Sequence, residues 1–243
     1  MMKLLFLLFS GVKFGKLLTT GGTMIVSVAL YAWIFGWWYA VGFVLLMFVH
    51  ELGHFFAARQ RGLRAGLPTF IPFLGAWTEI KDQPHDAETE AYIGLGGPLA
   101  GTVASILCYF LARNYDSDLL MAVAYSGFFL NLFNMIPLSP FDGGRITAVL
   151  TPRIWFVGVP VLLALFYYRP SPMLIIIGLL AWPQLWRAWK YDPEAEENKA
   201  YYNMSGEVRF TYAAYYLILL GFLAVMTNDV HELVQAARQV KGI

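Results

Sequence analysis

The sequence predicts an all-α polytopic membrane protein with about six to seven transmembrane helices. Apolar residues make up 58% of the 243 positions, and charged residues only 14%. A soluble domain carries about 25% charged residues, so this chain has too few charges to cover a surface that faces water. Long apolar runs separated by turn residues point the same way, and most of the exterior is therefore expected to face lipid.

Apolar runs of roughly 17 to 25 residues indicate transmembrane helices. The candidate spans are residues 23–40, 41–58, 93–112, 119–137, 155–168, 173–185 and 211–227. The fifth and sixth runs are short and share one proline-containing turn at 169–172, which leaves the count at six or seven. Residues 191–209 form the longest polar stretch and are expected to be a surface loop with a short helix around 194–199.

Positive charge predicts the orientation of the bundle. With a cytoplasmic N-terminus and seven spans, thirteen of the seventeen lysines and arginines fall on the cytoplasmic side. Trp37, Trp38 and Tyr39 then form an aromatic anchor at the outer end of the first hairpin. The net charge of +1 and the lack of a basic cluster interleaved with aromatics give no sign of nucleic-acid binding.

Residues 1–10 form an apolar run like that of a signal peptide. Lys13 and Lys16 follow it where a small-residue cleavage site would be expected. A retained interfacial or membrane-embedded segment is therefore favoured over a cleaved signal. Cys108, the single cysteine, cannot form an internal disulfide and is interpreted as a small core or lipid-facing residue.

The second span carries the pattern His50-Glu51-Leu52-Gly53-His54. Two histidines four residues apart project from one face of a helix, one turn apart, and can bind a single zinc ion. Glu51 can then act as general base toward a water molecule that the zinc activates. The plain alternative is polar packing inside a helical bundle, but burying an ionisable residue at membrane depth costs several kcal/mol, which favours a functional role.

A zinc site with two histidines needs a third protein ligand and leaves the fourth position for water. Asp142 is the best candidate, because Pro137 and Pro140 end the preceding helix and irregular backbone at membrane depth is tolerated where it lines a cavity. The alternative is that Asp142 is a turn residue or helix N-cap. His85 and His231 are expected in solvent, since each lies in a polar or terminal segment.

Together these motifs resemble the site-2 protease family of intramembrane zinc metalloproteases. The match includes the histidine motif, the Gly-Gly-Pro-Leu-Ala-Gly segment at 96–101, and the Asn-x-x-Pro-x-x-x-x-Asp-Gly pattern that starts at Asn134, and it covers residues 41–146. The resemblance implies that Asn134 polarises the scissile carbonyl or stabilises its oxyanion, with an interhelical hydrogen bond as the alternative. It also implies Glu51 as catalytic base and a zinc-ligand set of His50, His54 and Asp142.

The family resemblance also helps to interpret two further segments. Residues 68–80 are too broken by proline for a helix and suit extended structure. The resemblance implies a small membrane-associated β segment here that could pair with an unwound substrate by strand addition, although a plain loop is an alternative. Gly97 and Gly101 form a small-residue face that allows helices to approach closely.

The chain is expected to be a compact member of that family. Residues 81–92 are too few for an inserted peptide-binding domain, and no C-terminal regulatory domain is expected. Three regions follow: an N-terminal interfacial or embedded segment (1–22), a catalytic membrane core (23–150), and C-terminal membrane helices with the polar loop at 191–209 (151–243).

The sequence thus predicts an intramembrane zinc metalloprotease with one zinc ion per chain, acting in a lipid bilayer on a peptide bond within or near a transmembrane segment of a membrane protein. One alternative is another class of membrane zinc protease with a glutamate as third ligand, for which Glu79 or Glu207 would need testing. Two hypotheses without proteolysis are an inactive homologue that binds membrane helices and a transporter with a zinc-binding centre.

Overall fold

The computed structural model describes the backbone of residues 2–72 and 75–241. It describes the surroundings of the side chains for residues 19–72, 75–237 and 239. The N-terminal segment predicted at 1–22 lies within the first helix from residue 2 onward. Residue 1 and the side chains up to residue 18 lie outside the described part. Within the described residues the chain forms α1 (Met2–Phe35), α2 (Trp37–Gln60), β1 (Thr69–Ile71), β2 (Gly75–Trp77), α3 (Ala87–Tyr115), α4 (Asp118–Asn134), α5 (Asp142–Thr147), η1 (Pro152–Ile154), α6 (Trp155–Tyr168), α7 (Pro172–Trp189), α8 (Glu196–Tyr202) and α9 (Gly206–Lys241).

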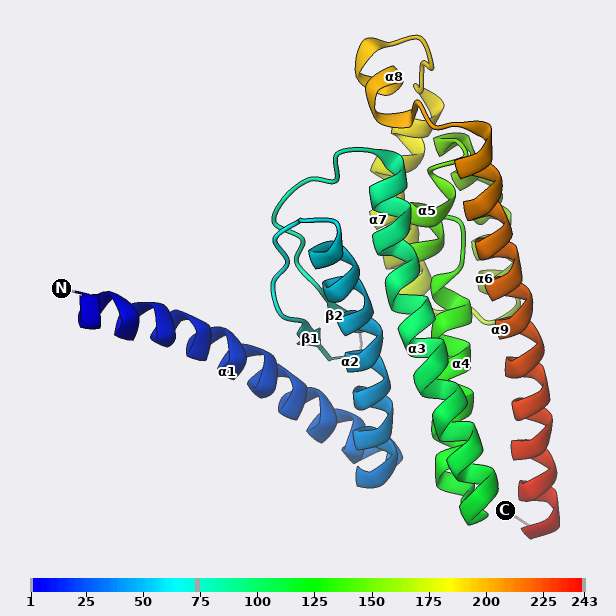
Figure 1. Cartoon of the computed structure of the whole chain (residues 1–243). Coiled ribbons are helices and arrows are strands. Elements are labelled where there is room, and N and C mark those ends of the chain that lie inside the picture. The colour runs from blue at the N-terminus through cyan, green and yellow to red at the C-terminus, as the bar shows by residue number, and fades with distance from the viewer. Residues whose placement is uncertain (1, 73–74, 242–243) are drawn as a thin grey trace.

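Four helices, α2, α3, α4 and α9, lie side by side and alternate in direction (Figure 1). The two ends of the segment between α2 and α3, helix α8 and the start of α9 lie at one end of this bundle, whereas β1 and β2 lie beside α2 (Figure 1). The α3–α4 turn and the described C-terminal end lie at the other (Figure 1). Each predicted span thus corresponds to a helix, and the short helix predicted at 194–199 is α8.

The chain is a membrane protein with long apolar helices. In the described part, three helices have the length and hydropathy to cross a bilayer, namely Trp37–Gln60, Ala87–Tyr115 and Gly206–Ala237. Thr19–Phe35 and Pro152–Tyr168 are apolar but shorter. The count of six to seven spans therefore stays a prediction.

The boundary predicted between the first two spans, at residues 40 and 41, is wrong. Helix α1 ends at Phe35 and α2 begins at Trp37. Gly36 separates them with a φ of +86°, a conformation that side-chain-bearing residues rarely adopt. Because apolar residues continue on both sides, hydropathy gave no cue to this break, and Trp37 and Trp38 lie exposed at the start of α2.

The extended segment predicted at 68–80 is a β-hairpin, not a plain loop. Strands β1 and β2 pair antiparallel, with Phe70 opposite Ala76. Phe70 is buried beside α2, where its ring lies 6.2 Å from that of Phe48. Hydrogen bonds from Arg64 to Asp82 close the loop below the hairpin and lower the pKa of the Asp82 carboxyl to about 2.

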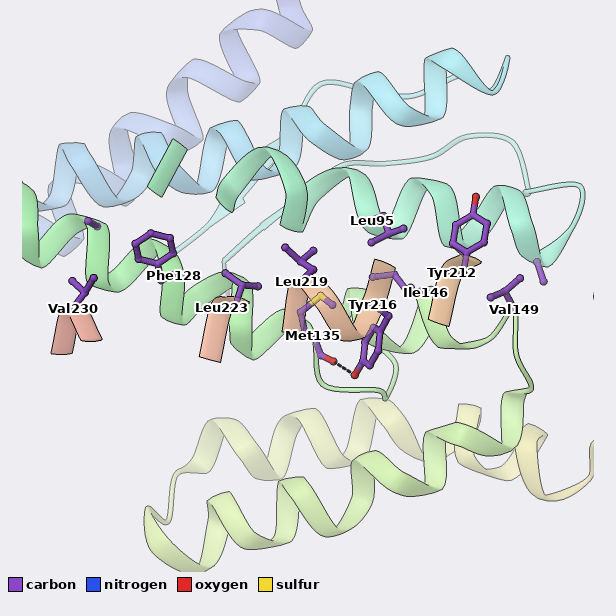
Figure 2. Packing of buried hydrophobic residues seen from close by; sticks show 13 residues of the cluster. Leu95, Phe128, Met135, Ile146, Val149, Tyr212, Tyr216, Leu219, Leu223 and Val230 are labelled. Carbon is purple, nitrogen blue, oxygen red and sulfur yellow. Dashed lines mark hydrogen bonds between the residues drawn. The ribbon is translucent and has the colours of Figure 1, made fainter. Parts of the chain in front are cut away.

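The core beside α9 explains how the C-terminal helix is held. Its inward-facing residues are spaced three, four or seven apart, which keeps them on one helix face, and they are Tyr212, Tyr216, Leu219, Leu223 and Val230. Figure 2 shows these residues against side chains of α3, α4 and α5. The Tyr216 hydroxyl donates a buried 2.6 Å hydrogen bond to the Met135 carbonyl, just past the end of α4 (Figure 2).

The backbone between α4 and α5 is irregular, as Pro137 and Pro140 predict. Two glycines at the start of α5 allow it to fold back closely: a Cβ on Gly143 would collide with the Met135 carbonyl, and one on Gly144 would lie 2.5 Å from the Ser139 nitrogen. The absence of a side chain at both glycines therefore permits this close approach. The turn packs closely against the start of α5, which carries Asp142.

Candidate metal centre and active site

Helices α2 and α5 bring together two histidines and an aspartate. His50 and His54 lie one turn apart on α2, Asp142 is the first residue of α5, and all three side chains are buried. Nε2 of His50 lies 3.1 Å from Nε2 of His54 and 3.1 Å from Oδ2 of Asp142. Nε2 of His54 lies 3.2 Å from Oδ1 of Asp142. These three residues form one group of converging metal-ligand atoms.

The opposite nitrogen of each histidine ring has its own partner. Nδ1 of His54 lies 2.8 Å from the carbonyl oxygen of Ile93 on α3. A carbonyl can only accept, so Nδ1 of His54 carries the proton and its Nε2 carries a lone pair directed at the group. Nδ1 of His50 lies 2.8 Å from the side-chain oxygen of Asn131 on α4. Such outer partners orient histidines that bind metals.

The donor set fits a zinc ion. Zinc bonds to histidine nitrogen and carboxylate oxygen are about 2.0–2.2 Å long, so a tetrahedral site places its ligand atoms about 3.3 Å apart. The separations of 3.1 to 3.2 Å match this spacing. Two imidazole nitrogens and a carboxylate that face one another need a proton or a cation between them, since otherwise lone pairs confront lone pairs.

Gly97 on α3 keeps the space beside the two nitrogens open. A Cβ built on Gly97 would collide with Nε2 of His54 and lie 2.7 Å from Nε2 of His50. The neighbouring Gly96 contacts α2 directly, because a Cβ there would lie 2.6 Å from the Gly53 carbonyl oxygen. The close helix approach predicted for Gly97 is confirmed, and this residue also forms a wall of the metal site.

Glu51 follows His50 on α2 and is buried. Its carboxylate makes none of the hydrogen bonds found among the described residues, and it lies outside the three-residue ligand group. Its backbone carbonyl accepts a 3.1 Å hydrogen bond from the hydroxyl of Thr78, which follows β2. The hairpin is thus joined to α2 at the residue proposed as general base.

Asn134, which the sequence singled out, is the last residue of α4 and partly buried. The structure does not bring its side chain into hydrogen bonding with the ligand group within the described residues, and its role stays a prediction. The amide that touches the group belongs to Asn131, one turn earlier. A second asparagine at i−3 in an apolar helix was the available signal, because that spacing shares a helix face.

The remaining histidines and the two glutamates that could replace Asp142 as ligand lie elsewhere. His85, His231, Glu79 and Glu207 are all exposed and outside the metal-ligand group. A different third ligand therefore has no support in the described part of the chain.

A cavity of about 660 Å³ lies near the turn that carries Asp142. Ser139 from the turn, Arg145 from α5 and Trp155 from α6 line one side of it, and the end of α7 and α8 line the other. The cavity therefore extends between α8 and the turn that precedes Asp142.

Comparison with known proteins gives a consistent result. Residues 38–117 match the model of peptidase family M50. The chain is similar to zinc metalloprotease MJ0392 of Methanocaldococcus jannaschii, with 28% identity over 152 residues, 59% of this chain and 44% of that protein. It is also similar to the probable chloroplastic zinc metalloprotease EGY1 of Arabidopsis thaliana, with 28% identity over 153 residues, 44% of this chain and 28% of that protein.

Among solved structures, the site-2 protease from Methanocaldococcus jannaschii matches with 23% identity and a TM-score of 0.44, over 71% of this chain and 88% of that one. The matches to the two curated metalloproteases span less than half of their length. Zinc, the cofactor predicted from the sequence, agrees with the names of both relatives, and His50, His54 and Asp142 form a possible site for it.

Proposed function

We propose that the chain, whose residues 38–117 match the model of peptidase family M50, is a site-2-type zinc metalloprotease of that family and hydrolyses a peptide bond within or near a transmembrane segment of a membrane protein substrate. His50, His54 and Asp142 would hold one zinc ion. The observation that carries the proposal is the buried convergence of these three side chains, with Glu51 next to them on α2.

When bound by these residues, a zinc ion would supply a Lewis acid for the scissile carbonyl and would lower the pKa of water toward neutrality. Glu51 accepts the proton of the attacking water and returns it to the nitrogen of the leaving amine. Its burial excludes bulk water, which strengthens the electrostatic interactions on which this transfer depends. Asn134 is proposed to donate its side-chain N–H to the carbonyl oxygen as negative charge develops there.

The β-hairpin is proposed to hold the substrate in an extended form. Strand β1 contacts α1, where the Phe70 nitrogen donates to the Thr23 hydroxyl over 3.2 Å. Among the described strands β2 pairs only with β1, so a third strand is proposed to add at the other edge of β2, and Thr78 connects the segment after β2 to Glu51. A substrate helix that unwinds and pairs there by strand addition would expose its peptide bonds beside the proposed base.

The orientation is also a proposal, with the N-terminus on the cytoplasmic side of a multi-pass protein. The lysine and arginine distribution supports it, and so does the alternation of α2, α3, α4 and α9, which places the end of α2, the start of α3, α8 and the start of α9 at one end of the bundle (Figure 1).

The proposal is tested with purified protein in lipid nanodiscs. Membrane proteins that accumulate intact in cells carrying a Glu51→Gln variant, compared with cells carrying the native protein, provide the substrates. Native protein is expected to cleave them, to lose activity when a chelator removes zinc, and to recover it when zinc is returned. Cleavage that persists without zinc would contradict the proposal.

The same preparation distinguishes a protease from the two functions without proteolysis. An inactive homologue would bind zinc and the substrate helix without cutting either the candidate substrates or a pool of single-span proteins. A transporter would instead move zinc into proteoliposomes. Both results would overturn the assignment as a protease.

A further inference from the structure

Asn131 is the most deeply buried polar side chain at the metal centre, with 1% of its surface exposed. It lies on α4 and faces α2 and α3. Its Oδ1 lies 2.8 Å from Nδ1 of His50, and its Nδ2 lies 2.7 Å from the carbonyl oxygen of Gly127, one turn earlier on α4. Both ends of the amide therefore have partners.

The Gly127 carbonyl determines which way the amide points. A backbone carbonyl can only accept, so the nitrogen of the amide must face it and the oxygen must face His50. That oxygen can only accept, so Nδ1 of His50 must donate a proton. The neutral ring then carries its lone pair on Nε2, the nitrogen that faces Asp142 and His54.

Gly101 on the neighbouring helix α3 leaves room for the Asn131 amide because it has no side chain. A Cβ built on Gly101 of α3 would collide with Oδ1 of Asn131 and lie 2.7 Å from its Nδ2. The hydroxyl of Ser105 on α3 donates to the Gly101 carbonyl over 2.7 Å. The Asn131 side chain therefore lies between α2 and α3, and its amide has one orientation that satisfies both hydrogen-bond partners.

We propose that Asn131 is a positioning residue of the metal centre. It does not bind the metal, which His50, His54 and Asp142 would hold, but through His50 it sets the metal affinity and the coordination geometry. Its significance for hydrolysis rests on the proposed function, but its effect on metal binding can be measured without any substrate. Asn131 and Asn134, one turn apart on α4, would thus have separate roles, the first in metal binding and the second in chemistry.

The test uses a pair of matched variants in the full chain. Asn131→Leu keeps a similar volume and removes the acceptor for His50, so affinity for Zn²⁺ is expected to fall about 10- to 100-fold, the usual effect of losing such an outer partner. The visible spectrum of the Co²⁺-loaded protein should change as well. Asn134→Leu carries the same substitution one turn away, and its Zn²⁺ affinity and Co²⁺ spectrum should stay close to native.

A second measurement does not depend on how the variant folds. In native zinc-loaded protein with ¹⁵N-labelled histidines, two slowly exchanging Nδ1–H protons are expected, one from His50 and one from His54. Coordination of His50 through Nδ1 would overturn the inference. So would native metal affinity together with a native Co²⁺ spectrum in a folded Asn131→Leu protein.

These results separate the inference from the proposed function. Metal binding that depends on Asn131 in a protein that cleaves nothing would support the positioning role and refute the protease assignment. Metal binding that does not depend on Asn131, in a protein that cleaves its substrates, would support the protease assignment and refute the positioning role.

Discussion

Replacing Gly97 with alanine places a methyl group beside the two metal-binding nitrogens. The added Cβ would lie 2.7 Å from Nε2 of His50, whereas ordinary contact begins at 3.4 Å, and it would collide outright with Nε2 of His54. The His50 ring would have to retreat by about 0.7 Å, while metal–ligand distances tolerate only about 0.2 Å. Helix α3 cannot move away without opening the contact between Gly96 and Gly53.

The expected result for Gly97→Ala is loss of the metal without loss of the helix. Zinc measured by mass spectrometry after purification should fall from one per chain to less than about a tenth, and cleavage should fall about 10²-fold or more, because the zinc ion supplies several kcal/mol of transition-state stabilisation. Alanine favours a helix by about 1 kcal/mol over glycine, so the fold is expected to survive by circular dichroism.

Gly178→Ala in α7 is the matched control, because a Cβ at that position meets nothing within 4 Å. It should bind zinc and cleave substrate as the native protein does. Full zinc occupancy and normal cleavage in Gly97→Ala would refute the reasoning, since the metal could not then lie between these nitrogens.

Three other predictions follow from the structure. Zinc content should be lost when any of the proposed ligands is replaced by alanine, and full occupancy in one variant would remove that residue from the set of His50, His54 and Asp142. Tyr216→Phe should lower the free energy of unfolding by about 1–3 kcal/mol, because it leaves the buried Met135 carbonyl without its partner; the exposed Tyr215→Phe is its control, and equal stability of both variants would contradict the contact. With Cys108→Ser as background, single cysteines at 59–64 and 191–209 should be labelled only from the cytoplasmic face, and labelling of 59–64 only from the outer face would invert the proposed orientation.

Much of the site could be predicted because its parts are local. The spacing of His50 and His54 fixes them on one helix face whatever the rest of the chain does. Asp142 could be predicted because Pro137 and Pro140 end a helix in a place where only a functional cavity tolerates irregular backbone. These inferences needed no knowledge of which helices pack together.

The choice between Asn131 and Asn134 did need that knowledge. Both lie on one face of α4, and only the packing of α4 against α2 and α3 decides which amide reaches His50. The break at Gly36 could not be predicted either, because the apolar run continues across it and only the backbone conformation marks it. The hairpin register likewise depends on Phe70 finding a buried position beside α2.

The central claim is that the three ligands bind zinc and that Glu51 moves the proton. Its most direct test compares zinc content and substrate cleavage in a single preparation of Glu51→Gln, which keeps the size of the side chain and removes the base. We expect one zinc per chain and cleavage reduced about 10²- to 10⁴-fold. Near-normal cleavage with zinc in place, or loss of zinc together with cleavage, would contradict the claim.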